Sequence, residues 1–208
     1  LLRNPPVPGE ITLNTVEYDI SSSRYLDASP LVKPEMVTDA ARRIAPDSLG
    51  LLETVGAVVD WVHANIRYER GATSVATSAE HILETRTGVC QDMTHLAIAL
   101  LRALGIPTRY VSGLLATQAG ETHAWIEFLH PGLGWLPADP TRGHRLSVDD
   151  DLIKFAIGMD YTQASPVEGT FVSPGAGHLD IAVGKALPDD RTPSLEDARN
   201  LIRNSANV

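Results

Sequence analysis

The hydrophobic pattern of this chain changes its period at Pro107, and this change constrains the fold more than any other feature. Before Pro107, apolar residues recur at the three-and-four spacing of helices that bury one face. These stretches run from about residue 35 to Pro46, over 51–66 and over 90–104. The third stretch is followed by Gly105 and Pro107, which end helices.

After Pro107 the sequence favours strands. Runs rich in β-branched and aromatic residues occupy 108–115, 123–129 and 134–137, with a Pro-Gly turn signal before the last. Helices first and strands later predict an α+β fold.

A short helix is also predicted ahead of the third long one. Thr77 and Glu80 have the spacing of a capping box, in which each side chain satisfies a backbone donor at the helix start. This helix should run to about Thr85.

Both ends of the given sequence are predicted to lie outside the catalytic core. Residues 1–34 contain five prolines and an alternating apolar run before three serines, and we expect a linker and the remnant of an upstream β-rich domain. The catalytic core is expected over 35–187, with two further strands at 169–172 and 178–183. Residues 188–208 should form a tail with a short helix.

Composition narrows the classes of partner. The formal net charge is −9 and no Lys/Arg cluster occurs, which argues against nucleic acid and anionic membrane surfaces. No apolar run approaches the roughly 18 residues of a membrane span, and no segment resembles a signal peptide. We therefore expect a peptide or protein substrate and a cytoplasmic protein, while the oligomeric state stays open.

Cys90 is the single cysteine of the chain, so it cannot form an internal disulfide. Lone cysteines are commonly buried core residues, and burial alone would favour that interpretation. Cys90, however, follows Gly88 and precedes two polar residues at the start of a predicted helix. Unpaired amides and the helix dipole at such a position stabilise a thiolate, so the sequence favours a nucleophile.

His123 and Asp139 are the candidate partners of this thiol. His123 begins a predicted strand whose alternation puts it on one face with Trp125 and Glu127. Asp139 follows the next strand, where its carboxylate could orient an imidazole. Taken singly, the two residues read as a surface histidine and a turn aspartate, and only their combination with Cys90 points to catalysis.

Several blocks in order carry a family resemblance. They are Gly-Val-Cys-Gln-Asp at 88–92, Gly-Ile-Pro-Thr-Arg-Tyr-Val-Ser-Gly at 105–113, His-Ala-Trp-Ile-Glu at 123–127, Gly-Trp at 134–135 and Asp-Pro-Thr at 139–141. Together they resemble the core of the bacterial transglutaminase-like superfamily, which is related to papain.

The resemblance implies a papain-like core in which the nucleophile starts a helix packed on an antiparallel sheet, with Cys90, His123 and Asp139 as the catalytic triad. It implies acyl transfer on amide bonds through a thioester, most simply as a cysteine protease or amidase. The Cys90 amide would serve as one oxyanion donor. Gln91 and Trp125 are candidate neighbours of the site, and the second oxyanion donor is unidentified.

Three alternatives remain beside this hypothesis. An amine acceptor in place of water would make a transglutaminase, although the tryptophan that animal transglutaminases use upstream of the cysteine has no counterpart in 73–78. A protein-binding domain with an idle triad is the non-enzymatic alternative. A metal site assembled from Cys90, His81, His95 and His123 lacks any metal-binding spacing, so neither metal nor cofactor is expected.

Overall fold

The protein is described from a computed structural model, which describes residues 18–116, 122–147 and 151–165. Its helices are α1 (Ile20–Ser23), α2 (Thr38–Ile44), α3 (Leu51–Asn65), α4 (Ala79–Thr85), α5 (Cys90–Ala103) and α6 (Tyr161–Ala164), with 3-10 turns η2 (Arg24–Leu26) and η3 (Pro34–Met36). The strands are β1 (Arg67–Tyr68), β2 (Thr87–Gly88), β3 (Thr108–Leu115), β4 (Thr122–His130), β5 (Gly134–Ala138) and β6 (Leu152–Gly158).

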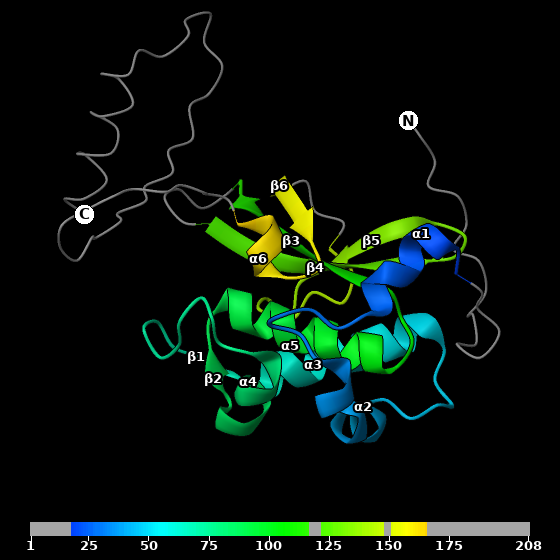
Figure 1. Cartoon of the computed structure of the whole chain (residues 1–208), viewed down its shortest axis with the longest axis horizontal. Coiled ribbons are helices and arrows are strands. Elements are labelled where there is room, and N and C mark those ends of the chain that lie inside the picture. Colours follow the sequence, from blue (N-terminus) through cyan, green and yellow to red (C-terminus); the bar gives the residue numbers. More distant parts are fainter. Residues whose placement is uncertain (1–17, 117–121, 148–150, 166–208) are drawn as a thin grey trace, which may run out of the picture.

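A four-stranded sheet forms one layer of the fold, and α2, α3, α4 and α5 form the other (Figure 1). The strand order is β5-β4-β3-β6, and each neighbouring pair is antiparallel. Strands β1 and β2 make a separate parallel pair. The predicted α+β class and the antiparallel sheet are both confirmed.

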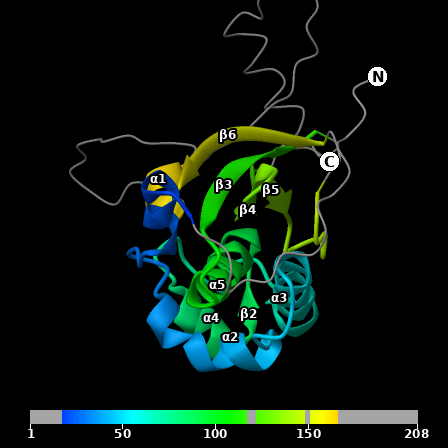
Figure 2. The ribbon, with the colours of Figure 1, turned by 90° about the vertical axis from the view of Figure 1, so that its right-hand side faces the viewer.

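Helix α5 is the central element, with the sheet on one side and α2, α3 and α4 on the other (Figure 2). Every residue from Asp92 to Arg102 is buried, including apolar side chains on all its faces. Burying each large apolar side chain contributes about 1.5–3 kcal/mol. The helix ends before Gly105, whose φ of +79° is a left-handed conformation that glycine adopts without strain.

The buried Arg102 near the end of α5 joins segments that are distant in the sequence. Its guanidinium donates to the carbonyl oxygens of Thr108 (2.8 and 3.0 Å), Asp27 (2.9 Å) and Met159 (2.7 Å). Burial lowers the pKa of Arg102 to about 10, so the group remains charged at neutral pH. One side chain thereby ties η2, β3 and the end of β6 to α5.

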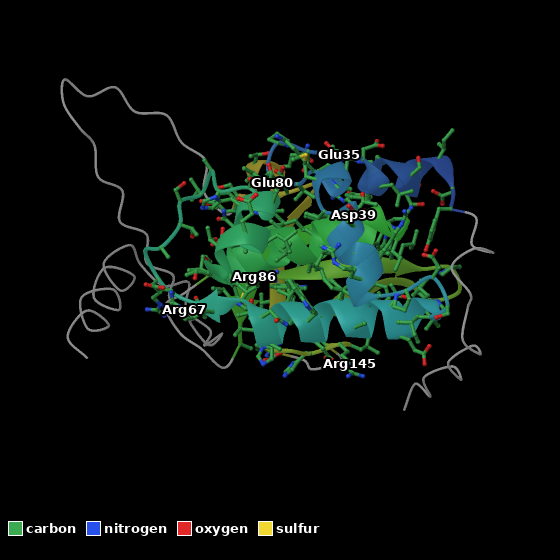
Figure 3. The ribbon with its side chains drawn as sticks, turned by 90° about the horizontal axis from the view of Figure 1, so that it is seen from below. Glu35, Asp39, Arg67, Glu80, Arg86 and Arg145 are labelled. Carbon is green, nitrogen blue, oxygen red and sulfur yellow. The ribbon has the colours of Figure 1, made fainter. Side chains whose placement is uncertain are left out.

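Helix α3 packs against α5, and the apolar residues over 51–66 face the core as predicted. Its buried residues include Leu51, Val55 and Val62, whereas His63 is exposed. Seen from the helical side, the outer surface carries charged side chains such as Arg86, whose guanidinium lies 4.5 Å from the centre of the Trp61 ring (Figure 3).

Two local predictions are wrong. Ser78, not Thr77, is the N-cap of α4 and makes no side-chain cap, while the Thr77 hydroxyl accepts from the Ser74 amide instead. The capping box therefore does not form, although α4 does end at Thr85 as predicted. The serines at 21–23, predicted as a loop, form α1 because the Asp19 carboxylate caps the helix by accepting from the Ser22 amide (2.9 Å).

Strand β6 (Leu152–Gly158) is not among the strands that the sequence predicts. The predicted strands at 169–172 and 178–183, the tail over 188–208 and the apolar alternation before residue 18 lie outside the described residues. The boundaries 1–34, 35–187 and 188–208 stay predictions. None of the helices in the described ranges is long and apolar enough to span a membrane.

Candidate active site

Cys90 is the first residue of α5, as the sequence predicts. The preceding residue, Val89, is the N-cap with an extended backbone, and the helix begins there because the Asp92 carboxylate accepts from the Val89 amide (2.8 Å). Only this half of a capping box exists, since a valine side chain has no acceptor. The thiol is partly buried, and it lies where the helix dipole stabilises negative charge.

His123 reaches the site from β4. The predicted alternation is confirmed, because Ala124, Ile126 and Phe128 pack in the core on the opposite face. On the imidazole's own face, Trp125 stacks against it with ring centres 6.2 Å apart and planes at 24°. Gly113 on β3 makes room for that indole, since a Cβ there would lie 2.5 Å from the Trp125 ring.

Asp139 follows β5 and is held by a dense set of donors. Its Oδ2 is 2.7 Å from Nε2 of His123 and 2.6 Å from Nε of Arg142. Its Oδ1 accepts from the backbone amides of Thr141 (2.9 Å) and Arg142 (3.1 Å). Arg142 continues to the Asp151 carboxylate (2.6 Å), so a chain of ion pairs fixes the orientation of Asp139.

These contacts set the charges of the histidine and the aspartate. Burial, the largest influence, would lower the pKa of His123, but hydrogen bonds and opposite charge from Asp139 and Cys90 outweigh it and raise the pKa to about 9. Burial would likewise raise the pKa of Asp139, yet His123 and Arg142 hold it below its usual range. An imidazolium beside an ionised carboxylate is therefore favoured at neutral pH.

The two ring nitrogens of His123 have different partners. Nε2 lies 2.7 Å from Oδ2 of Asp139, and a hydrogen bond with the Cys90 side chain contributes to the raised pKa of His123. We assign this second hydrogen bond to Nδ1, because Nε2 already contacts Asp139. The three predicted residues thus form one hydrogen-bonded row, from a helix start, a strand and the turn after the next strand. Such a row can hold a thiolate and an imidazolium together.

The row opens into a cleft of about 300 Å³. Its lining residues are Tyr68, Arg70, Cys90, Leu115, Thr122, His123, Thr141 and Arg142. Cys90 and His123 are both reachable from the cleft, whereas the Asp139 side chain is fully buried behind them.

The other two predicted site residues do not line the cleft. The side-chain amide of Gln91 donates to the Val75 carbonyl (3.2 Å), which does not favour it as an oxyanion donor. Trp125 is 1% exposed and supports His123 from behind.

The sequence patterns did not identify Arg142, Asp92 and Tyr68 as residues of the site. The signal for Arg142 was its position three residues after a candidate acid, and the signal for Asp92 was its position in the first turn of a helix. Nothing in the sequence around Tyr68 marks it as part of a cleft. Within the described residues, no group of three or more histidine, cysteine, aspartate or glutamate side chains could hold a metal ion.

Comparison with known families places these features in context. The model of the transglutaminase-like superfamily matches residues 38–140, a range that contains Cys90, His123 and Asp139. A crystal structure from Cytophaga hutchinsonii, provisionally named a cysteine protease, is 32% identical with a TM-score of 0.65. That similarity covers 72% of this chain and 50% of the other.

Curated relatives give the same picture. An uncharacterised protein of Mycobacterium leprae is 36% identical over 140 residues, which are 63% of this chain and 49% of the relative. A Pseudomonas aeruginosa protein-glutamine gamma-glutamyltransferase is 33% identical over 81 residues, 34% of this chain and 12% of its own length. This chain spans about half the length of the mycobacterial relatives that it matches.

Proposed function

The chain belongs to the transglutaminase-like superfamily through residues 38–140, and on this premise we propose that it is a thiol-dependent hydrolase of amide bonds. In this proposal Cys90 is the nucleophile, His123 the acid and base, and Asp139 the residue that orients the imidazole. The hydrogen-bonded row of the three side chains at the cleft is the observation that carries the proposal.

The resting charges suit attack on a carbonyl carbon. The thiolate of Cys90 forms the S–C bond, and the carbonyl electrons move to oxygen to give a tetrahedral oxyanion. When the carbonyl reforms, the C–N bond breaks and the amine nitrogen takes the proton from Nδ1 of His123. The products of this half-reaction are a free amine, a thioester on Cys90 and a neutral imidazole.

Hydrolysis of the thioester restores the starting charges. Neutral His123 removes a proton from water, the resulting hydroxide adds to the thioester carbon, and the S–C bond breaks. The acid product departs, and the thiolate and imidazolium are restored. Asp139 stays ionised throughout, because its donors His123 and Arg142 stabilise the charged form.

We propose water as acceptor, and a peptide or protein amide as substrate. The similarity to the Cytophaga structure supports hydrolysis, while the relative named a glutamine gamma-glutamyltransferase supports an amine acceptor as the competing outcome. The same first half-reaction serves both, so only the products distinguish them.

Alkylation of Cys90 by iodoacetamide tests the activated thiol. We expect Cys90 to be alkylated readily at neutral pH, because the His123 imidazolium pairs with the sulfur. In His123→Ala the rate at that pH should fall at least tenfold, because the imidazolium that holds the thiolate is gone. The control His81→Ala removes an exposed histidine and should alkylate like the wild type. A pH profile unchanged by His123→Ala would reject the proposed pair.

The acceptor is tested with a peptide library analysed by mass spectrometry, with and without a labelled primary amine. Cleaved peptides that appear in both reactions, and not with Cys90→Ala, support hydrolysis. Incorporation of the amine would establish a transglutaminase instead. An activated thiol that transforms no peptide would favour a binding domain.

A further inference from the structure

A tetrahedral oxyanion at Cys90 needs donors on the side of the sulfur away from His123. The reason is that the imidazole must face the departing nitrogen, and the oxygen points elsewhere on the same carbon. The backbone amide of Cys90 has no partner within the helix, because Cys90 is the first residue of α5, and it is one such donor. A second donor has to come from the cleft wall beside the helix start.

Tyr68 of β1 and Arg70 after it line the cleft, and β1 is held in place by its pairing with β2. In Figures 1 and 2, β2 lies on the helical side of the start of α5, whereas β4, which carries His123, lies on the other side. The two short strands pair in parallel, with Tyr68 opposite Gly88. Backbone hydrogen bonds from Arg67 to Arg86 (2.9 Å) and from Glu69 to Gly88 (3.0 Å) hold Tyr68 between them.

Tyr68 is therefore fixed relative to the turn that ends in Cys90. Gly88 is two residues before the nucleophile, so the pairing couples the position of the tyrosine to that of the sulfur. The side chain is 47% exposed rather than packed in the core, and it lines the cleft together with Cys90 and His123. An aromatic side chain with a hydroxyl group at a cleft wall brings a donor to a partly dry surface.

We propose that Tyr68 is the second oxyanion donor, with its phenol O–H and the Cys90 amide sharing the negative oxygen. This inference rests on the proposed function of Cys90 and adds a catalytic residue to it. The resting cleft does not need the hydrogen bond, because the oxyanion exists only after the S–C bond has formed.

Other polar residues of the cleft fit this role less well. Thr122 comes from β4, the strand of His123, and Thr141 comes from the turn after Asp139. Arg142 already donates to Asp139 and Asp151. Arg70 lies two residues after Tyr68 and lines the same cleft, so it is the competing donor that the experiment has to separate.

Two reagents separate oxyanion stabilisation from thiol activation. Iodoacetamide reacts with the thiolate by displacement of iodide and forms no oxyanion. p-Nitrophenyl acetate acetylates the sulfur through a tetrahedral oxyanion: the S–C bond forms, then the C–O bond to nitrophenolate breaks and nitrophenolate leaves as the anion. Its release is followed by absorbance, and acetylation of Cys90 by mass spectrometry.

In Tyr68→Phe we expect acetylation of Cys90 to slow roughly 10- to 100-fold, as for loss of one oxyanion donor elsewhere. Alkylation by iodoacetamide should keep the wild-type rate, because the thiolate pair is intact. The matched control is Tyr25→Phe, since Tyr25 packs edge-on against Trp135 and is not among the cleft residues.

The outcomes are distinct. Equal slowing of both reagents in Tyr68→Phe would mean a structural role and overturn the proposal, as would wild-type rates with both. Loss of acetylation in Arg70→Gln, with Tyr68→Phe unaffected, would assign the donor to Arg70 instead. If wild-type Cys90 alkylates only as an ordinary thiol, the proposed function itself fails, and this result is visible before any tyrosine variant is made.

Discussion

Two fully buried aspartates lie near the candidate nucleophile, and their pKa values are shifted in opposite directions. Asp139, after β5, has a lowered pKa, whereas Asp92, in the first turn of α5, has a raised one. Burial is the largest influence on both and raises the pKa in each case. The difference therefore comes from their partners.

The partners of Asp139 include two cationic side chains, His123 and Arg142. The hydrogen-bond partners of Asp92 are neutral, the Thr73 hydroxyl (2.6 Å) and the Val89 amide (2.8 Å), and its Oδ1 has no hydrogen-bond partner among the described residues. His81 adds only the weakest of the influences on the pKa of Asp92. Neutral donors do not compensate for the burial of a charge as cations do. One carboxylate is thus suited to catalysis, and the other to shaping the turn before Cys90.

Among these substitutions, replacing Asp139 should reduce the reactivity of Cys90 the most. In Asp139→Asn the amide cannot supply the negative charge that holds His123 protonated, so acetylation of Cys90 should fall on the order of 10³-fold or more at neutral pH. Stopped-flow measurement of nitrophenolate release checks this. Asp151→Asn is the control, since it removes the outer partner of Arg142 and leaves the His123–Asp139 contact. An Asp139→Asn protein as fast as its control would show that the carboxylate is not needed.

Replacing Arg142 should have a smaller effect, on the stability of the fold and on its dependence on pH. Arg142→Met should lower the free energy of unfolding by about 1–3 kcal/mol, because it deletes a charged donor to a buried carboxylate. The stability that Asp139 gives is present above its ordinary pKa of 3.8 and is lost as pH falls through its lower folded value. In the variant this loss should begin at higher pH.

Urea denaturation as a function of pH measures both effects. Arg142→Lys keeps a cation, so its free energy of unfolding should lie between those of Arg142→Met and the wild type. Acid profiles that coincide for the wild type and Arg142→Met would mean that His123 alone keeps Asp139 ionised.

Replacing Asp92 should have the smallest effect and the opposite pH dependence. Because its folded pKa is raised, wild-type stability falls as pH rises above the ordinary value of 3.8. Asp92→Asn keeps one acceptor for Thr73 and Val89 without a buried charge. It should differ from the wild type by about 1 kcal/mol or less, gaining relative stability as pH rises towards neutrality. A large loss at neutral pH would show that the charged form stabilises the turn.

Much of the site could be predicted because each part depended on local pattern. The stripe after Cys90 indicated a helix, and the alternation from His123 indicated which face the imidazole shares with Trp125. The order of the motifs then predicted that Cys90 and His123 lie close to Asp139. Their assignment as a catalytic triad stays a prediction until Cys90 is tested chemically.

What could not be predicted depends on contacts between distant segments. Tyr68 enters the cleft only because β1 pairs with β2, and two-residue strands leave no periodic signal. The capping box at Thr77 failed because the hydroxyl was already used by the Ser74 amide, a competing local hydrogen bond. Strand β6 exposes Ile153, Phe155 and Ile157 at the edge of the sheet, a pattern without the usual polar outer face.

Helix α5 carries the candidate nucleophile at its first residue and a buried arginine that links distant segments near its last. Cys90 is its first residue, and Arg102 near its end donates hydrogen bonds to carbonyl oxygens at the end of η2, in β3 and in the segment after β6. A helix anchored in this way cannot melt while those segments stay in place. Heat inactivation and loss of tertiary structure should therefore be a single cooperative event, without a partly folded form that keeps a competent thiol.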